Sequence, residues 1–396
     1  MNFFYLLKYL FIYYLLFSCN SLKNKDVDLN TNLIYDYHLY LNPIINDSLT
    51  SKIVFDSGAN GFYLDSLFSS KMCGKAKISS FYVSGVGEKK QKISILNDSV
   101  EVDFNNEKRI FGNVPILNLK RIIGSDVNGL IGNSFFSNNV VMIDYKQQKI
   151  EVFKEKSQLE LNSFFSFPIK KNLKKEMIVN LKLVIDDNDF EGEYLIDTGS
   201  PQLITFTNKF SLLKNLDTIS NKKFYFSNNY GIGGRSEGYS FSKKMIILND
   251  VKIYNPVFDF SVDNSGSLNS NDYEGIIGNR FLENFIVVID YKNDVLYLKP
   301  NYLNNKLEDN YISRYIGFSA INYNYFGNGW LVSVLFDDGK NGGIEIGDIV
   351  LKVNDVNVKD VVLRRDFHKL FDKYSNQLEI LRKNKIIRII YKKAEY

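Results

Sequence analysis

Histidine and cysteine are scarce in this chain, with two of each among its 396 residues. The histidines, His38 and His368, are far apart in the sequence and lie outside the repeats described below. Their scarcity argues strongly against a Ser-His or Cys-His nucleophile and against a zinc site of the ordinary His/Cys type. We therefore expect neither a metal nor another cofactor.

Long runs of like charge are also missing. The net charge is +4, and lysine pairs such as Lys170-Lys171 are short and are not grouped with aromatic residues in a nucleic-acid motif. Nucleic acid is therefore not an expected partner.

Hydrophobic residues at 45% and charged residues at 24% are typical of a globular protein. The 31 phenylalanines and 26 tyrosines favour β-structure, and the length allows two or three domains.

Two short segments, Phe55 to Ala59 and Ile196 to Ser200, are near copies of each other. Each places an aspartate, a hydroxyl residue and a glycine directly after an apolar run. One such tripeptide is weak support for a site, because these residues are ordinary turn formers. An unpaired carboxylate leaving a buried strand is nevertheless costly. Two of them that meet across a pseudo-twofold axis would form a carboxylate pair.

A second repeated element lies downstream of each copy. Gly129 to Phe136 (GLIGNSFF) leads into Val140 to Lys146, and Gly275 to Leu282 (GIIGNRFL) leads into Ile286 to Lys292. The aspartates are 141 positions apart and the second elements are 146 apart. Because chance does not produce two ordered pairs at such similar offsets, the chain contains an internal duplication.

Together these motifs resemble the pepsin-like and retropepsin-like aspartic proteases, over roughly residues 30 to 300. Each lobe of that family carries an Asp-Ser/Thr-Gly turn and, later, an apolar-apolar-Gly segment that braces it. The resemblance implies a mostly β chain with two pseudo-symmetric β-barrel lobes. It also implies that Asp56 and Asp197 are the catalytic residues of an aspartic-type endopeptidase.

The resemblance assigns supporting roles to the neighbours of these aspartates. Ser57 and Thr198 would hydrogen-bond across the lobe interface to the opposite backbone, and Gly58 and Gly199 would permit the tight turns. Asp144 and Asp290 are also repeated, in the I-D-Y segments, and we interpret this second pair of aspartates as structural.

A glycine-bearing segment lies between the two motifs of each lobe. It contains Gly85 and Gly87 in the first lobe, and Gly231 and Gly233 in the second. In the resembling family a β-hairpin flap occupies this region and closes over bound peptide, and glycine tolerates the turns that such a tip requires. The alternative is an ordinary hairpin turn.

The chain changes character after residue 311. The stretch from Gly347 to Asp355 (GDIVLKVND) resembles a bacterial-type PDZ domain, and apolar spacing between residues 361 and 374 predicts the helix beside its groove. The carboxylate-binding loop would include Ile316, Gly317 and Phe318. In that family a peptide C-terminus adds as a strand beside the groove. We therefore expect a protein C-terminus as partner and a role in recruiting the substrate.

The first 17 residues are almost wholly apolar and suit a secretory signal peptide. The end of this segment, Leu16 to Cys19, looks like a bacterial lipobox. A polar tether would span residues 20 to 32. We expect Cys19 to be lipidated and to hold the protein on a membrane of the bacterial cell envelope, on the periplasmic side or at the outer-membrane surface. The alternatives are an uncleaved anchor and a plain signal peptide. If Cys19 is lipidated, Cys73 has no partner in the chain and no disulfide framework exists.

The predicted organisation is a signal peptide (1–19), a tether (20–32), two protease lobes (33–155 and 165–300) and a PDZ-like domain (312–396). The predicted function is hydrolysis of peptide bonds by a water held between Asp56 and Asp197. The alternative is a catalytically weak, peptide-binding envelope lipoprotein. In both cases the partner is a peptide or protein.

Overall fold

The computed structural model of the chain describes residues 33–72, 78–83, 91–104, 107–220, 223–231, 234–302, 307–309, 315–324, 328–336 and 342–393. Cys19, Cys73, Gly85, Gly87 and Gly233 lie outside these ranges, as do the predicted signal peptide and tether. Within these ranges, no helix has both the length and the hydropathy needed to cross a membrane.

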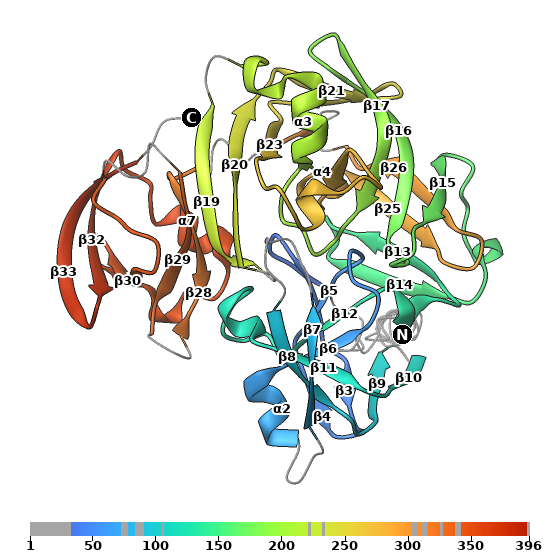
Figure 1. The fold of residues 1–396 in the computed structure, drawn as a ribbon, viewed down its shortest axis with the longest axis horizontal. Helices are drawn as coiled ribbons and strands as arrows, with labels where there is room; N and C mark the ends of the chain where they lie inside the picture. Colours follow the sequence, from blue (N-terminus) through green and yellow to red (C-terminus); the bar gives the residue numbers. More distant parts are fainter. Residues whose placement is uncertain are drawn as a thin grey trace, which may run out of the picture.

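The first lobe is built on an open sheet of eight strands in the order β1-β2-β5-β12-β6-β11-β8-β7, next to a four-stranded sheet, β10-β9-β3-β4 (Figure 1). Its central strand β5 is apolar and fully buried, as a strand covered on both faces must be. The elements are β1 (Ile34–Tyr35), β2 (Leu39–Leu41), β3 (Ile44–Ile45), β4 (Leu49–Thr50), β5 (Ile53–Phe55), β6 (Phe62–Asp65), α2 (Ser66–Met72), β7 (Ile78–Val83), β8 (Gln91–Leu96), β9 (Val100–Phe104), β10 (Glu107–Phe111), β11 (Val114–Leu117), β12 (Gly129–Ile131) and short 3-10 turns at Leu119–Arg121 and Asn133–Phe136.

The second lobe repeats this topology. Its strands pair in the order β16-β17-β24-β18-β23-β20-β19, and β17 is parallel to β24 as β5 is to β12. The sequence duplication is therefore a duplication of the fold. The elements are β16 (Met177–Ile185), β17 (Asn188–Ile196), β18 (Ile204–Phe206), α3 (Asn208–Lys214), β19 (Phe224–Gly231), β20 (Gly234–Ser242), β21 (Met245–Leu248), β22 (Val251–Tyr254), β23 (Val257–Ser261), β24 (Gly275–Ile277), α4 (Asn279–Leu282) and 3-10 turns at Leu216–Thr218 and Ser267–Asn269.

A further sheet joins the lobes. Its strands pair in the order β14-β13-β25-β26-β15, and β13 of the first half is antiparallel to β25 of the second. The elements are β13 (Val140–Asp144), β14 (Lys149–Phe153), β15 (Phe165–Lys171), β25 (Phe285–Asp290) and β26 (Val295–Pro300), with a 3-10 turn at Lys156–Gln158. The predicted mostly-β, two-lobed fold is confirmed, with one correction. In the described part of the chain the strand orders do not close into barrels.

The C-terminal unit, residues 315–393 of the described chain, has its own core. Trp330 stacks on Phe367 with ring centroids 4.5 Å apart, and Phe318, Phe371 and Tyr391 pack around them. The predicted helix within residues 361–374 is the short α7. The elements are β28 (Phe318–Asn322), β29 (Trp330–Phe336), β30 (Ile349–Val353), β31 (Val356–Asn357), a 3-10 turn at Val358–Asp360, α7 (Arg364–Lys369), β32 (Ser375–Arg382) and β33 (Lys385–Lys392).

Two strand pairings attach this unit and its connection to the second lobe. The hairpin strand β19 pairs with β29, with Ser227 opposite Leu335. The connecting strand β27 (Leu307–Glu308) runs parallel to β22. The unit is therefore hydrogen-bonded to the lobe by backbone ladders.

Candidate active site

Both repeated aspartates lie where a buried strand ends. The N–H of Asp56, just after β5, donates to the Ile131 carbonyl at 2.9 Å, and the N–H of Asp197, just after β17, donates to the Ile277 carbonyl at 2.9 Å. These bonds extend the parallel pairs β5–β12 and β17–β24 by one residue. Each aspartate thus has the same backbone position in its lobe. We name residues 56–59 the Asp56 turn and residues 197–200 the Asp197 turn.

The two turns lie face to face. A methyl group on Gly58 would lie 2.7 Å from Cγ of Asp197, and one on Gly199 would lie 2.4 Å from Cγ of Asp56. Neither distance can accommodate a side chain, so each glycine lets the opposite carboxyl approach the backbone. The two carboxyl groups are within hydrogen-bonding reach of each other. Both aspartates are half-buried, so the pair keeps access to solvent.

Burial is the main reason why the pKa values of both carboxyl groups are raised. Burial, followed by the charge of Asp197, raises the pKa of Asp56 well above its usual value. Burial likewise raises the pKa of Asp197. Backbone N–H groups oppose this: Gly58 and Ala59 donate to Asp56 Oδ1 at 2.8 and 3.0 Å, and Gly199 donates to Asp197 Oδ1 at 2.8 Å. A carboxyl pair with raised pKa values retains one proton at a pH at which isolated aspartates would both be ionised.

Ser57 and Thr198 lock the turns together with four reciprocal hydrogen bonds. Ser57 Oγ donates to the Ile196 carbonyl at 2.8 Å and accepts from the Thr198 N–H at 2.9 Å. Thr198 Oγ1 donates to the Phe55 carbonyl and accepts from the Ser57 N–H, both at 2.9 Å. Neither residue has any exposed surface. The hydroxyls thus lie where the resemblance predicts, bonded across the interface.

A second layer of polar residues was not identified from the sequence. Asn133 Nδ2 donates to the Ser57 carbonyl and Asn279 Nδ2 to the Thr198 carbonyl, each at 2.6 Å. Each asparagine accepts from a tyrosine of the other half of the chain: Tyr291 O–H to Asn133 Oδ1 at 3.0 Å, and Tyr145 O–H to Asn279 Oδ1 at 2.8 Å. All four belong to the repeated G-N-x-F and I-D-Y segments, so the repeat in the sequence could have identified them.

The aspartates of the I-D-Y segments are the last residues of β13 and β25, and each accepts hydrogen bonds from the turn that follows. Asp144 Oδ1 accepts from the N–H groups of Lys146 and Gln147. Asp290 Oδ1 accepts in the same way from Lys292 and Asn293. These bonds are those of an ordinary Asp-led turn and match their interpretation as structural.

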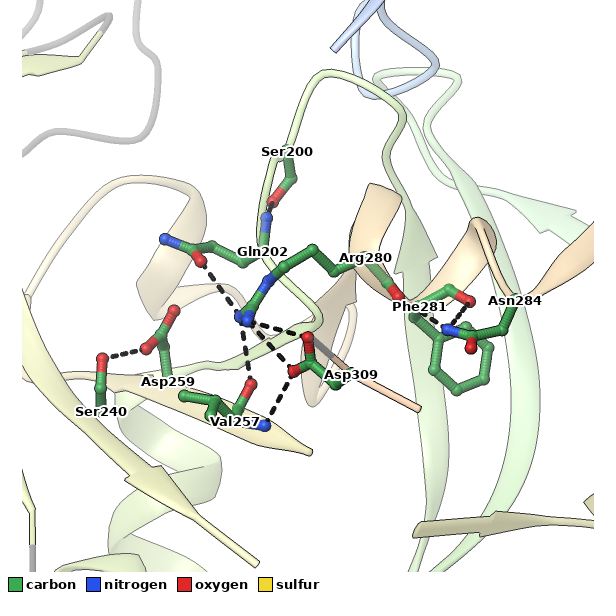
Figure 2. Close-up of polar contacts among 9 residues, drawn as sticks. All are labelled: Ser200, Gln202, Ser240, Val257, Asp259, Arg280, Phe281, Asn284 and Asp309. Carbon is green, nitrogen blue, oxygen red and sulfur yellow. Dashed lines mark hydrogen bonds and ion pairs between the residues drawn. The ribbon is translucent and has the colours of Figure 1, made fainter. Parts of the chain in front are cut away.

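A buried ionic cluster lies behind the Asp197 turn (Figure 2). Arg280 follows Asn279 and reaches the side chains of Asp309, at 3.1 Å, and Gln202, at 3.3 Å. Asp309 also accepts from the N–H of Val257 at 3.0 Å. Both members of the ion pair are almost fully buried, and such a pair is costly to break because one charge is left without compensation. The first lobe has Ser134 in the place of Arg280, so this cluster is not part of the pseudo-symmetry.

Asp259 belongs to the same region. It is 3% exposed and accepts from Ser240 Oγ (Figure 2). Burial raises the pKa of Asp259 to about 6, although the positive charge of Arg280 acts in the opposite direction. Asp259 is therefore a titratable group of the second lobe outside the facing turns.

The two glycine-bearing segments belong to corresponding hairpins. Gly85 and Gly87 fall between β7 and β8, outside the described residues. Gly231 ends β19, and Gly233 is likewise outside. The flap role of either segment stays a prediction. In the second lobe, however, the β19–β20 hairpin is hydrogen-bonded to β29 of the C-terminal unit.

The predicted groove residues lie at the start of β28. The side chains of Ile316 and Phe318 are 1% and 2% exposed and belong to the core of the C-terminal unit. The Ile316 carbonyl accepts from Tyr391 O–H at 2.5 Å, and the Gly317 carbonyl accepts from the Phe336 N–H at 3.1 Å. Gly317 has φ of 83°, in the region that favours glycine. Recognition of a peptide by this loop stays a prediction.

The described residues contain no cluster of three or more His, Cys, Asp or Glu side chains that could hold a metal ion.

Comparison with known proteins gives a limited result. No family model matches the chain. No curated protein matches it either. Among solved structures, the chain is similar to basic 7S globulin from soybean, with 10% sequence identity and a TM-score of 0.41, over 68% of this chain and 94% of that one.

Proposed function

We propose that the chain is an aspartic endopeptidase that hydrolyses peptide bonds with a water held by Asp56 and Asp197. The observation that carries the proposal is the face-to-face arrangement of the two turns, in which each glycine makes room for the opposite carboxyl. Holding two half-buried carboxyl groups against each other costs stability. Four hydrogen bonds and two asparagines nevertheless hold them there.

The chemistry follows from the shared proton. Like charges about 3 Å apart cannot both ionise cheaply, so one carboxyl is protonated while the other is ionised. The ionised carboxylate takes a proton from the water as general base. The protonated carboxyl donates a hydrogen bond to the scissile carbonyl as it becomes tetrahedral. The oxygen of the water bonds to the carbonyl carbon, the C–N bond of the tetrahedral species then breaks, and the proton taken from the water passes to the leaving nitrogen. Cleavage therefore needs no covalent intermediate. The pair titrates as a unit, so we assign the base role to neither aspartate alone.

A second candidate function is a peptide-binding protein with little catalysis. It is favoured by the C-terminal unit, which resembles a peptide-binding domain. It is disfavoured by the retention of both aspartates and both glycines, which a decayed protease usually loses.

We propose that the C-terminal unit binds the C-terminus of a substrate or partner. Among the described residues β28 pairs only with β29, and α7 lies near its other side, with Phe318 and Phe367 ring centroids 6.4 Å apart. A bound peptide would add as a strand along β28, and the loop of Ile316, Gly317 and Phe318 would present backbone N–H groups to its carboxylate. Binding of a fluorescent peptide with a free carboxyl end, lost when that end is amidated, tests this role.

We also propose that Cys19 is lipidated and tethers the protein to a membrane of the bacterial envelope. The apolar leader and the lipobox-like end support this. Labelled fatty acid should enter the wild type but not Cys19→Ser. A mature protein that begins elsewhere and is found free in solution would contradict it.

The enzyme proposal is tested by incubating the purified protein with an unfolded polypeptide between pH 3 and 8. We expect new peptide termini, and we expect a statine-type mimic of the tetrahedral state to suppress them. Binding of the polypeptide without any cleavage across this range would contradict the proposal and favour the binding protein.

A further inference from the structure

The turn between β1 and β2 lies between the C-terminal unit and the Asp197 turn. Asp36, in this turn, accepts from the backbone N–H groups of Arg364 and Arg365, at 2.6 and 3.1 Å, where α7 begins. The guanidinium of Arg364 lies over the ring of Tyr37, 5.4 Å from its centroid. Asp36 is only 8% exposed, so its carboxylate depends on these protein donors more than on water.

The same turn contacts the Asp197 turn on its other side. The Tyr37 carbonyl accepts from Asn279 Nδ2 at 3.0 Å, and this Nδ2 also donates to the Thr198 carbonyl at 2.6 Å. The buried His38 ring lies against the backbone of Gly199. The turn of residues 36 to 38 therefore contacts the two residues that follow Asp197: it reaches Thr198 through Asn279, and it reaches Gly199 directly.

The conformation of this turn depends on its surroundings. Tyr37 has φ of 64°, in the left-handed region that bulky residues rarely adopt. Such a conformation persists only where neighbouring groups hold it. Burial, together with the charge of Arg364, lowers the pKa of His38 to about 3. His38 is therefore uncharged at neutral pH where it contacts the Asp197 turn. The contacts from α7 are thus part of what defines the shape of residues 36 to 38.

The connection to the C-terminal unit makes a second set of contacts near the Asp197 turn. Asp309 follows β27, in the stretch that leads to the C-terminal unit, and its ion pair with Arg280 continues to Gln202, close after the Asp197 turn (Figure 2). Asn279 and Arg280 are adjacent in α4. The β1–β2 turn and the connection to the C-terminal unit thus meet at this helix.

From this geometry we propose that the C-terminal unit positions the Asp197 turn for catalysis, with Asp36 as the positioning residue that links α7 to Thr198 and Gly199. The proposal rests on the proposed function and deepens it, because the unit then acts on the catalytic pair as well as on recruitment. Asp36 does not touch the carboxyl pair. Its effect passes through the Tyr37 carbonyl and the His38 ring.

The test uses the full-length protein and three variants: Asp36→Ala, Asp36→Asn and, as a matched control, Asp250→Asn at an exposed turn of the second lobe. Cleavage of a short fluorogenic peptide gives kcat and KM per folded molecule. We expect Asp36→Ala to lower kcat by about 10- to 100-fold with little change in KM, because the substrate still binds while the carboxyl is misplaced. Asp36→Asn keeps an acceptor oxygen and should recover part of the loss, and Asp250→Asn should match the wild type.

Amide hydrogen exchange provides a measurement that does not depend on activity. We expect residues 196–203 to exchange about tenfold faster in Asp36→Ala than in the wild type or in Asp250→Asn. Unchanged kcat and unchanged exchange in Asp36→Ala would overturn the proposal, and so would an equal loss in Asp250→Asn. If the wild type cleaves nothing, the proposed function fails. The exchange then decides alone: faster exchange supports the positioning role and unchanged exchange overturns it.

Discussion

The reciprocal bonds of Ser57 and Thr198 give a quantitative prediction. Thr198→Val keeps the shape of the side chain but removes both bonds of Oγ1, which leaves the Ser57 N–H and the Phe55 carbonyl without these partners. Each buried group left unpaired costs about 1 to 3 kcal/mol, so we expect a loss of about 2 to 6 kcal/mol in the free energy of unfolding. Ser57→Ala removes the two bonds related by the pseudo-symmetry and should cost a similar amount.

Ser211→Ala is a matched control for these variants. Ser211 is also buried, but its hydroxyl donates at 2.8 Å to the Thr207 carbonyl, which already accepts from the Ser211 N–H at 2.9 Å. Its removal leaves no group unpaired, and we expect a loss of about 1 kcal/mol or less. Denaturant unfolding measures the stabilities. Cleavage of a fluorogenic peptide measures kcat, which should fall by about 100-fold in the two interface variants and stay constant in the control. Interface variants as stable and as active as Ser211→Ala would refute the reasoning.

Three further predictions concern other residues around the turns. Gly199→Ala should abolish cleavage, because its methyl would lie 2.4 Å from Asp56 Cγ, whereas Gly112→Ala, with nothing within 4 Å, should be fully active; equal activities would contradict the facing arrangement. Tyr145→Phe and Tyr291→Phe should each cost about 1 to 2 kcal/mol of unfolding free energy, measured by denaturant, since each leaves an asparagine oxygen unpaired; a cost for only one of them would contradict the symmetry. The folded-state pKa of Asp259, about 6, lies above the ordinary value of 3.8, so its stabilising contribution is present below pH 4 and is lost as the pH rises through 6. Asp259→Asn should therefore gain roughly 3 kcal/mol relative to the wild type between pH 3 and pH 8, and a constant difference would contradict the buried ionisation.

The carboxyl pair could be predicted from the sequence because the duplication carries its own check. One Asp-Ser/Thr-Gly turn has many explanations, but a second copy with its own downstream G-N-x-F predicts that the two carboxylates share a site. The helix α7 (Arg364–Lys369) was likewise predicted, from the local apolar spacing between residues 361 and 374. These features depend on neighbours in the chain or on exact repetition.

The long-range contacts could not be predicted in the same way. Tyr291 donates to Asn133 across 158 positions, and Asp36 accepts from Arg364 across 328 positions. No local pattern specifies such partners, since a repeated tyrosine reads equally well as core. The β19–β29 pairing was missed for the same reason, because an edge strand does not encode which strand it will meet.

The pH dependence of kcat/KM tests the shared proton most directly. It is measured on one fluorogenic peptide, for the wild type and for Asp56→Asn and Asp197→Asn. The raised pKa of Asp56 and the mutual contact of the carboxyls predict a bell-shaped profile for the wild type: activity falls at low pH as both carboxyls become protonated, and at high pH as the shared proton is lost. Both variants should be inactive at every pH and at least as stable as the wild type. Substantial activity in either variant, or a wild-type rate that only rises toward alkaline pH, would contradict the account.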